Sequence, residues 1–259
     1  MNQLIEKIIN LSPKQFAKIL FKLPMISVYL QAPNIISPKE AFRLIFNDRF
    51  DEFDKYRMEF ISNHKFFESV NEKFIAKRSK RLIFEAWYEL IYVLIRAMKP
   101  QTILETGVFD GKSSAIILLA LHKNSQGSLV SIDFPATEIV RGSTECMSDT
   151  TLPLGCAPGW LIPDYLKDRH RLELGDSKKL LPELLHELKQ IDIFLHDSLH
   201  TYEHQYFEYG TAWPYLKQHG LLLSDDIFWS SAFHQFCREK KISYLNLFNN
   251  IGIVKRNKI

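Results

Sequence analysis

The chain has 259 residues, of which 46% are hydrophobic and 24% charged, a composition typical of a globular protein with a sizeable core and not of a disordered chain. Its formal net charge of +3 gives no support for a nucleic-acid partner. Its three cysteines, Cys146, Cys156 and Cys237, lack CxxC spacing, which argues against a zinc knuckle and against a disulfide framework.

The first hundred residues predict helices and carry most of the positive charge. They hold 17 basic against 11 acidic side chains, an excess expected to lie away from the glycine loop described below. Ser12, Pro13 and Gln15 form a helix start, and KQFAKILFKL (14–23) then places its apolar side chains on one stripe. This stripe predicts packing on the main domain or on a second copy in a homo-oligomer; weak contact with a membrane surface is the alternative.

Residues 50–70 and 82–98 predict further helices, so we interpret residues 1–99 as an N-terminal helical extension. The N-terminus lacks the apolar core and small-residue cleavage site of a signal peptide, and no 18-residue apolar run occurs. These observations predict a cytoplasmic protein without a membrane span.

From Pro100 onward, strands and helices alternate. This alternation predicts βαβ crossovers and a doubly wound, mostly parallel α/β sheet. The closing ISYLNLF-NN-IGIVKR (242–256) predicts a hairpin, so the last of seven strands runs antiparallel to the others. The five strands expected before the hairpin are TILET (102–106), GSLVSIDF (127–134), HRLELGD (170–176), IDIFLHD (191–197) and GLLLSDD (220–226).

An acidic residue stands at the end of each of these five strands. A single such acid could be a helix cap, but ligands bind at the carboxyl ends of the strands in sheets of this kind. The series therefore predicts a ligand site along this edge. Its members are Glu105, Asp133, Asp176, Asp197 and the pair Asp225–Asp226.

The loop after the first strand, ETGVFDGKSS (105–114), resembles the first motif of class I S-adenosylmethionine-dependent methyltransferases, which have a Rossmann-like fold. It lacks the third glycine of a dinucleotide-binding GxGxxG loop, which leaves a nicotinamide dinucleotide as a less favoured alternative. The resemblance implies that the cofactor lies against the bare backbone of the loop. The cofactor-binding residues that it implies are Glu105, Gly107, Gly111, Ser113, Ser114, Asp133 for the ribose, and Asp176 with Ser177 beside the adenine.

Residues 158–177, 194–204 and 220–226 extend the resemblance to the O-methyltransferase branch grouped with macrolide-sugar and cephalosporin-hydroxylase-like enzymes. The branch implies Mg²⁺-assisted methyl transfer to a hydroxyl of a small molecule, a sugar or a natural product. Asp197, Asp225 and Asp226 are the implied metal ligands. His200 is the implied general base, and Asp197 the second catalytic residue.

Other interpretations stay open at this point. HTYEH (200–204) matches the pattern of inverted zinc peptidases, although it directly follows a buried strand. An RNA or protein methyltransferase is disfavoured because no Asn-Pro-Pro-aromatic tetrad occurs, and a catalytically silent binding module of the same fold is the remaining rival. The insertion 134–163 predicts a lid, with Arg141 and Trp160 as candidates for contacting the acceptor.

Overall fold

A computed structural model describes residues 35–47, 49–134, 151–247 and 250–257 of the chain. The helix predicted at 12–23 and most of the predicted lid, including Arg141, lie outside these described residues. Contacts group residues 36–259 into one compact unit. The division into an extension and a catalytic domain at residue 99 stays a prediction.

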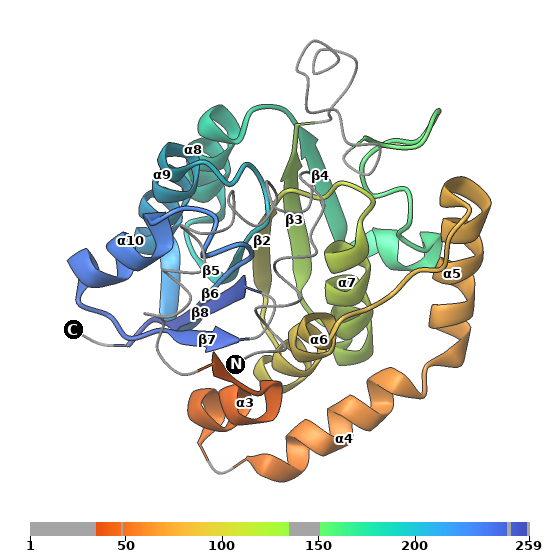
Figure 1. Cartoon of the computed structure of the whole chain (residues 1–259), viewed down its shortest axis with the longest axis horizontal. Coiled ribbons are helices and arrows are strands. Elements are labelled where there is room, and N and C mark those ends of the chain that lie inside the picture. The colour runs from red at the N-terminus through yellow and green to blue at the C-terminus, as the bar shows by residue number, and fades with distance from the viewer. Residues whose placement is uncertain (1–34, 48, 135–150, 248–249, 258–259) are drawn as a thin grey trace, which may run out of the picture. The chain divides into compact units, whose positions relative to one another are not determined.

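Among the residues that the structure describes, four helices precede the strand Thr102–Thr106 (Figure 1). The last of them is largely apolar, with Glu89 and Arg96 as its charged side chains, and its residues from Leu90 to Ile95 are buried by the elements around it. Ser37 caps the first through its side-chain oxygen, which accepts a hydrogen bond from the backbone N–H of Glu40. The four are α3 (Pro38–Phe46), α4 (Phe50–Ile61), α5 (His64–Arg78) and α6 (Ala86–Met98).

In the described ranges, the sheet has eight strands in the order β1-β7-β8-β6-β5-β2-β3-β4. Strands β2 to β6 pair in parallel, whereas β8 is antiparallel to both β6 and β7, as predicted for the last strand. The short β1 was not predicted. The strands are β1 (Ile35–Ile36), β2 (Thr102–Thr106), β3 (Ser128–Asp133), β4 (His170–Leu174), β5 (Ile191–His196), β6 (Leu216–Ser224), β7 (Leu245–Leu247) and β8 (Ile251–Lys255).

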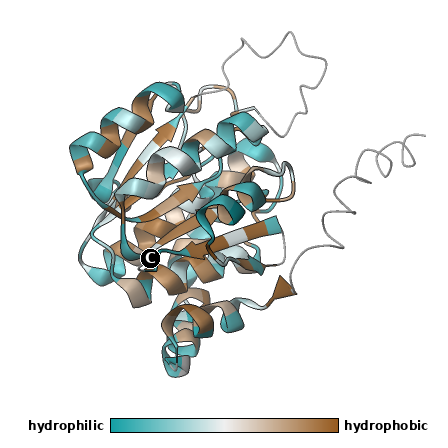
Figure 2. Ribbon diagram, turned by 90° about the vertical axis from the view of Figure 1, so that its left-hand side faces the viewer, coloured by the Kyte–Doolittle hydropathy of each residue, from teal (hydrophilic) through white to brown (hydrophobic). Residues whose placement is uncertain are grey.

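Helices cover both faces of the sheet, with α6 and α7 on one side and the later helices on the other (Figure 1). The central strands are largely hydrophobic, whereas the helices carry hydrophilic stretches (Figure 2). Helices of the sheet region are α7 (Lys112–Asn124), α8 (Ser177–Leu188), α9 (Tyr202–Ala212) and α10 (Ala232–Lys240), with short 3₁₀ helices η2 (Asp164–Arg169) and η3 (Trp213–Tyr215).

Alternation along each strand decides which helix layer a side chain meets. Ile103 belongs to the hydrophobic cluster that includes α6 and α7, and Glu105, two residues on, bonds to serines of α7. Thr106 therefore points to the other face, where its hydroxyl donates to Glu208 of α9. One strand thus supplies polar groups to both layers at the same edge of the sheet.

Within the part of the chain that the structure describes, no helix is both long enough and apolar enough to cross a membrane.

Candidate active site

The turn between β2 and α7 brings the backbone of Gly107 against the end of β5. Gly107 has a φ of 85°, and a Cβ added there would lie 1.9 Å from the carbonyl oxygen of Asp197. Gly111, with a φ of 91°, likewise packs against the Cα atom of Gly159, 2.8 Å from where its own Cβ would stand. Glycine is required at both positions because backbone occupies the space that a side chain would need.

Glu105, Ser113 and Ser114 hold this turn in place from inside the protein. Glu105 is fully buried, and its two carboxylate oxygens accept hydrogen bonds from Ser113 at 2.6 Å, Ser114 at 2.7 Å and Ser131 at 2.8 Å. Burial raises the pKa of Glu105, and the three hydroxyls oppose that rise. The sequence predicted ligand contacts for Glu105 and the two α7 serines, but here their polar atoms bond to one another, because a buried carboxylate needs donors.

A cavity of about 730 Å³ opens at the carboxyl ends of β2, β3, β4 and β5. Asp133 holds the turn beside it, since one of its oxygens accepts from the backbone N–H groups of Val108 at 2.7 Å and Phe109 at 2.8 Å. Asp176 caps α8 and accepts from the N–H of Lys178. Among the predicted cofactor residues, those that line the cavity are Gly107, Asp133, Asp176 and Ser177; Glu105, Gly111, Ser113 and Ser114 do not.

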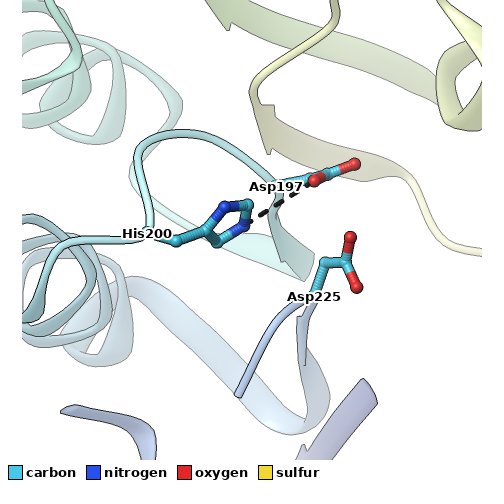
Figure 3. A group of neighbouring side chains, drawn as sticks. All are labelled: Asp197, His200 and Asp225. Atoms are coloured by element: carbon cyan, nitrogen blue, oxygen red, sulfur yellow. Dashed lines mark ion pairs between the residues drawn. The ribbon is translucent and has the colours of Figure 1, made fainter. Parts of the chain in front are cut away.

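Two carboxylates and an imidazole meet where β5 and β6 end (Figure 3). Asp197 follows β5 and Asp225 follows β6, and these strands pair in parallel with His196 opposite Ser224. One ligand atom from each of Asp197, His200 and Asp225 lies within 4.8 Å of the others, a spacing that could hold a metal ion. The sequence argument for neighbouring strand ends is thereby confirmed for Asp197 and Asp225.

Asp226, also predicted as a metal ligand, is not a member of this cluster. Its backbone is left-handed with a φ of 50°, and one of its oxygens accepts from the side-chain amide of Asn250 at 2.7 Å. The other oxygen faces His200, 3.6 Å from Nδ1. Asp226 thus borders the cluster through His200, and its role as a metal ligand stays a prediction.

The electrostatics of the cluster favour a positive ion. Burial, and after it the charge of Asp225, raises the pKa of Asp197 well above its usual range. Burial and the charge of Asp226 raise the pKa of Asp225 to about 6. Burial and the neighbouring His196 lower the pKa of His200 to about 4, so this imidazole is neutral at pH 7. Its Nε2 atom is buried without a hydrogen-bond partner among the described residues.

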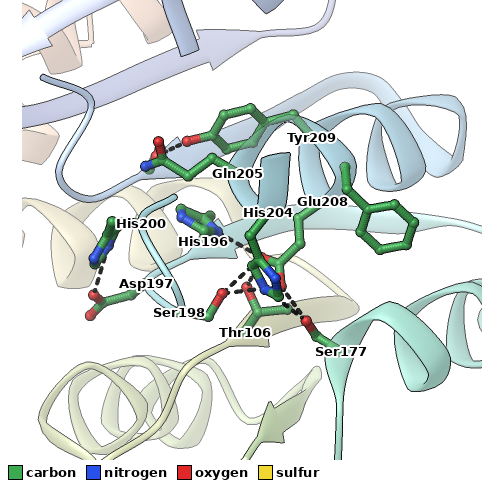
Figure 4. A network of polar contacts seen from close by, with 12 residues as sticks. Thr106, Ser177, His196, Asp197, Ser198, His200, His204, Gln205, Glu208 and Tyr209 are labelled. Atoms are coloured by element: carbon green, nitrogen blue, oxygen red, sulfur yellow. Dashed lines mark hydrogen bonds and ion pairs between the residues drawn. The ribbon is translucent and has the colours of Figure 1, made fainter. Parts of the chain in front are cut away.

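A second polar group, which the sequence argument missed, surrounds the buried Glu208 of α9 (Figure 4). Its carboxylate contacts His196 Nδ1 at 2.6 Å and His204 Nε2 at 2.9 Å. Burial alone would raise the pKa of Glu208, but its partners hold it below the ordinary range. It also accepts hydrogen bonds from Thr106, Ser177 and Ser198. The spacing of His204 and Glu208, one helical turn apart on α9, was a signal available in the sequence.

The same geometry separates the two histidines of HTYEH. His204 contacts Glu208 and Ser177, whereas His200 lies 3.8 Å from Asp197 through its Nε2 atom. They do not face a common centre, which removes the support for the zinc-peptidase interpretation.

The described end of the predicted lid is packed into the fold. The N–H of Gly159 donates to the carbonyl of Phe109, and that of Leu161 to the carbonyl of Asp110. Trp160, a predicted acceptor contact, instead stacks on Phe74 with ring centroids 6.2 Å apart and donates from Nε1 to Asp110 at 2.7 Å.

Comparisons with known proteins agree with this fold. Residues 104–227, just under half of the chain, match the model of a methyltransferase domain family (family 24). No curated protein matches the sequence at a significant level.

Three solved structures superpose on most of the chain, at identities that indicate a shared fold alone. A Staphylococcus aureus protein assigned as a caffeoyl-CoA O-methyltransferase has a TM-score of 0.53 and 15% identity, over 78% of this chain and 99% of its own. The methyltransferase PaMTH1 of Podospora anserina, solved with S-adenosylhomocysteine, has a TM-score of 0.52 and 16% identity, over 88% of this chain and 100% of its own.

An O-methyltransferase from Bacillus cereus, also in complex with S-adenosylhomocysteine, gives a TM-score of 0.52 and 13% identity over 74% of this chain and 91% of its own. The motif order, the sheet topology and the family match agree with one another. Residues 104–227 thus match a methyltransferase domain, and the chain shares its fold with methyltransferases that were solved with S-adenosylhomocysteine.

Proposed function

We propose that this enzyme methylates a hydroxyl group of a small molecule, a sugar or a natural product, with the help of a divalent cation. The observation that carries the proposal is the position of Asp197, which lines the strand-end cavity and also belongs to the cluster with His200 and Asp225. A methyl donor in the cavity and an acceptor at the cluster would therefore be neighbours.

The residues present fit a divalent cation. Two carboxylates offer the oxygen ligands that Mg²⁺ prefers, and the buried Nε2 atom of His200 lacks a partner among the described residues. The crowded acids that raise each other's pKa would be relieved by a positive charge. Asp197 and Asp225 would hold the cation, which when bound supplies Lewis-acid stabilisation of the acceptor oxygen.

Methylation of a hydroxyl forms an O–C bond, breaks the methyl–sulfur bond of the sulfonium donor and releases one proton. His200 would accept that proton, because it is neutral at pH 7 and adjoins both Asp197 and Asp226. Asp226, 3.6 Å from Nδ1, would stabilise the imidazolium that forms and orient the ring. The ring of His196 packs against that of His200, perpendicular to it and with the ring centroids 5.4 Å apart.

The test compares His200→Ala with Asp197→Asn by methyl transfer to a panel of sugars and hydroxylated natural products, measured as S-adenosylhomocysteine release. Both variants should lose activity and keep their affinity for S-adenosylhomocysteine. Glu203→Ala, an exposed change on α9, serves as the control. Activity that survives both changes would contradict the roles proposed for His200 and Asp197, whereas a wild type that transfers no methyl group would favour a catalytically silent module.

A Mg²⁺ titration of the same variants separates two roles for His200. If His200 is the base, His200→Ala binds Mg²⁺ as the wild type does, and only Asp197→Asn and Asp225→Asn lose the ion. Loss of Mg²⁺ binding in all three variants would make His200 a third ligand. A wild type that binds no Mg²⁺ would contradict the proposed cation site.

A further inference from the structure

A second pocket lies beside the glycine loop, lined by Phe109, Asp110 and Lys112 but by neither Asp133 nor Asp176 of the strand-end cavity. Its volume is about 350 Å³, within the range of small-molecule sites. Six charged residues line it, and we refer to it as the basic pocket. They are Arg78, Lys80, Arg81, Glu85, Asp110 and Lys112.

The charges of the basic pocket do not cancel. Arg78 and Asp110 are nearly buried and form a two-pronged ion pair, at 2.9 and 2.6 Å. This pair neutralises itself, and Trp160 adds a further hydrogen bond to Asp110. Lys80, Arg81 and Lys112 then stand against the single carboxylate of Glu85, which leaves an excess of two positive charges.

Two of the cations are available to a ligand. Within the ranges that the structure describes, neither Arg81 nor Lys112 has a carboxylate partner. Lys112 is half-buried, with its Nζ atom 5.5 Å from the ring centroid of Phe74. Partial burial reduces the solvent screening of its charge and so strengthens attraction for an anion.

The pocket also adjoins the catalytic region. The side chain of Phe109 lines both the basic pocket and the strand-end cavity. At the other side, Glu85 is close enough for its charge to act on Asp225, whose pKa rises through burial first, then Asp226, then Glu85. A molecule seated in the basic pocket would thus adjoin the strand-end cavity at Phe109.

This arrangement differs from the expectation that the basic excess of residues 1–100 lies away from the glycine loop. Arg78, Lys80 and Arg81 come from that basic region, and the packing of α5 brings them to Phe109 and Lys112. We infer that the basic pocket binds an oxyanion group of the methyl acceptor, a phosphate or a carboxylate, so that the enzyme selects anionic hydroxyl compounds. The inference rests on the proposed function for the identity of the ligand as acceptor.

The experiment is a calorimetric titration of the full chain, saturated with S-adenosylhomocysteine, with inorganic phosphate and in a separate arm with acetate. Chloride keeps the ionic strength constant, because screening alone would otherwise weaken binding. Arg81→Ala/Lys112→Ala should bind the anion about tenfold more weakly than the wild type, or not at all. Lys179→Ala/Arg238→Ala removes two exposed charges elsewhere and should bind as the wild type does.

A charge-conserving variant, Arg81→Lys/Lys112→Arg, should retain anion binding. It tests whether the weaker binding of Arg81→Ala/Lys112→Ala comes from the lost charges and not from misfolding. Tighter binding of phosphate assigns a phosphate, and tighter binding of acetate a carboxylate. The inference is overturned if the wild type shows no saturable anion binding, or if Arg81→Ala/Lys112→Ala binds equally well. Failure of the protein to bind S-adenosylhomocysteine would count against the proposed function instead, and the anion titration can be run without it.

Discussion

Replacing Gly107 by alanine tests whether the glycine loop and the acid cluster form one unit. The added Cβ would stand 1.9 Å from the carbonyl oxygen of Asp197 and 2.9 Å from the Cα of Ser198, so backbone must move. Gly155 is a matched control, because its φ of 74° is also left-handed but nothing lies within 4 Å of its Cβ position.

The difference between the two variants isolates the clash. A left-handed backbone costs a non-glycine residue about 1–2 kcal/mol, and both variants carry this cost. Displacing packed backbone adds about 1–3 kcal/mol at Gly107 alone. Gly107→Ala should therefore lower the free energy of unfolding by about 2–5 kcal/mol, against about 1–2 kcal/mol for Gly155→Ala.

Urea denaturation gives these free energies, and calorimetry gives the affinity for S-adenosylhomocysteine. We expect Gly107→Ala to lose both stability and affinity, because the loop and Asp197 line the same cavity. Gly155→Ala should keep its affinity. Equal stability and equal affinity of the two variants would refute the close approach of the loop to β5.

Three further changes probe the buried charges. Glu208→Ala removes the acceptor that His196 and His204 share, so it should lower the free energy of unfolding in urea by about 3–5 kcal/mol. Exposed Glu203→Ala on the same helix should change this free energy little. Equal effects of the two changes would contradict the polar contacts around Glu208. In the metal-free protein, the pKa of about 6 for Asp225 exceeds its unfolded value, so its contribution to stability is present below about pH 4 and is lost as pH rises through 6. Asp225→Asn should thus raise the free energy of unfolding at pH 8 by about 1 kcal/mol. Exposed Asp51→Asn is the control. No gain in stability would mean that burial and neighbouring charges do not raise the pKa of Asp225. Because protons compete with the cation at Asp225, Mg²⁺ affinity of the wild type should fall as pH drops below about 6, and a pH-independent affinity would place the ion elsewhere.

Local patterns were sufficient for the strands from β2 to β8 and for the meeting of Asp197 and Asp225. Alternating strands and helices predict a parallel sheet, and such a sheet aligns its strand ends whatever the side chains are. The hairpin predicted at the C-terminus is present, and helix α8 follows the third of the five predicted strands, as the alternation predicts. The predicted strand at 220–226 begins four residues earlier, at Leu216, because pairing with β5 extends it.

The directions of individual side chains could not be read from the sequence. Ser113 and Ser114 fit a ligand-binding role equally well until the burial of Glu105 is known, and then they are needed as its donors. Asp226 faces His200 with one oxygen and accepts from Asn250 with the other, an arrangement that sequence spacing does not reveal. The role of Glu208 depends on contacts with β2, β5 and α8, which only the assembled fold brings together.

The proposed function requires that the strand-end cavity holds the methyl donor next to a cation site. The most direct measurement is a calorimetric titration with S-adenosylhomocysteine followed by Mg²⁺, for the wild type and for Asp197→Asn/Asp225→Asn. We expect each wild-type chain to bind one S-adenosylhomocysteine and then one Mg²⁺. The double variant should bind S-adenosylhomocysteine but no Mg²⁺. A wild-type chain that binds no S-adenosylhomocysteine, or a double variant that binds Mg²⁺ unchanged, would contradict it.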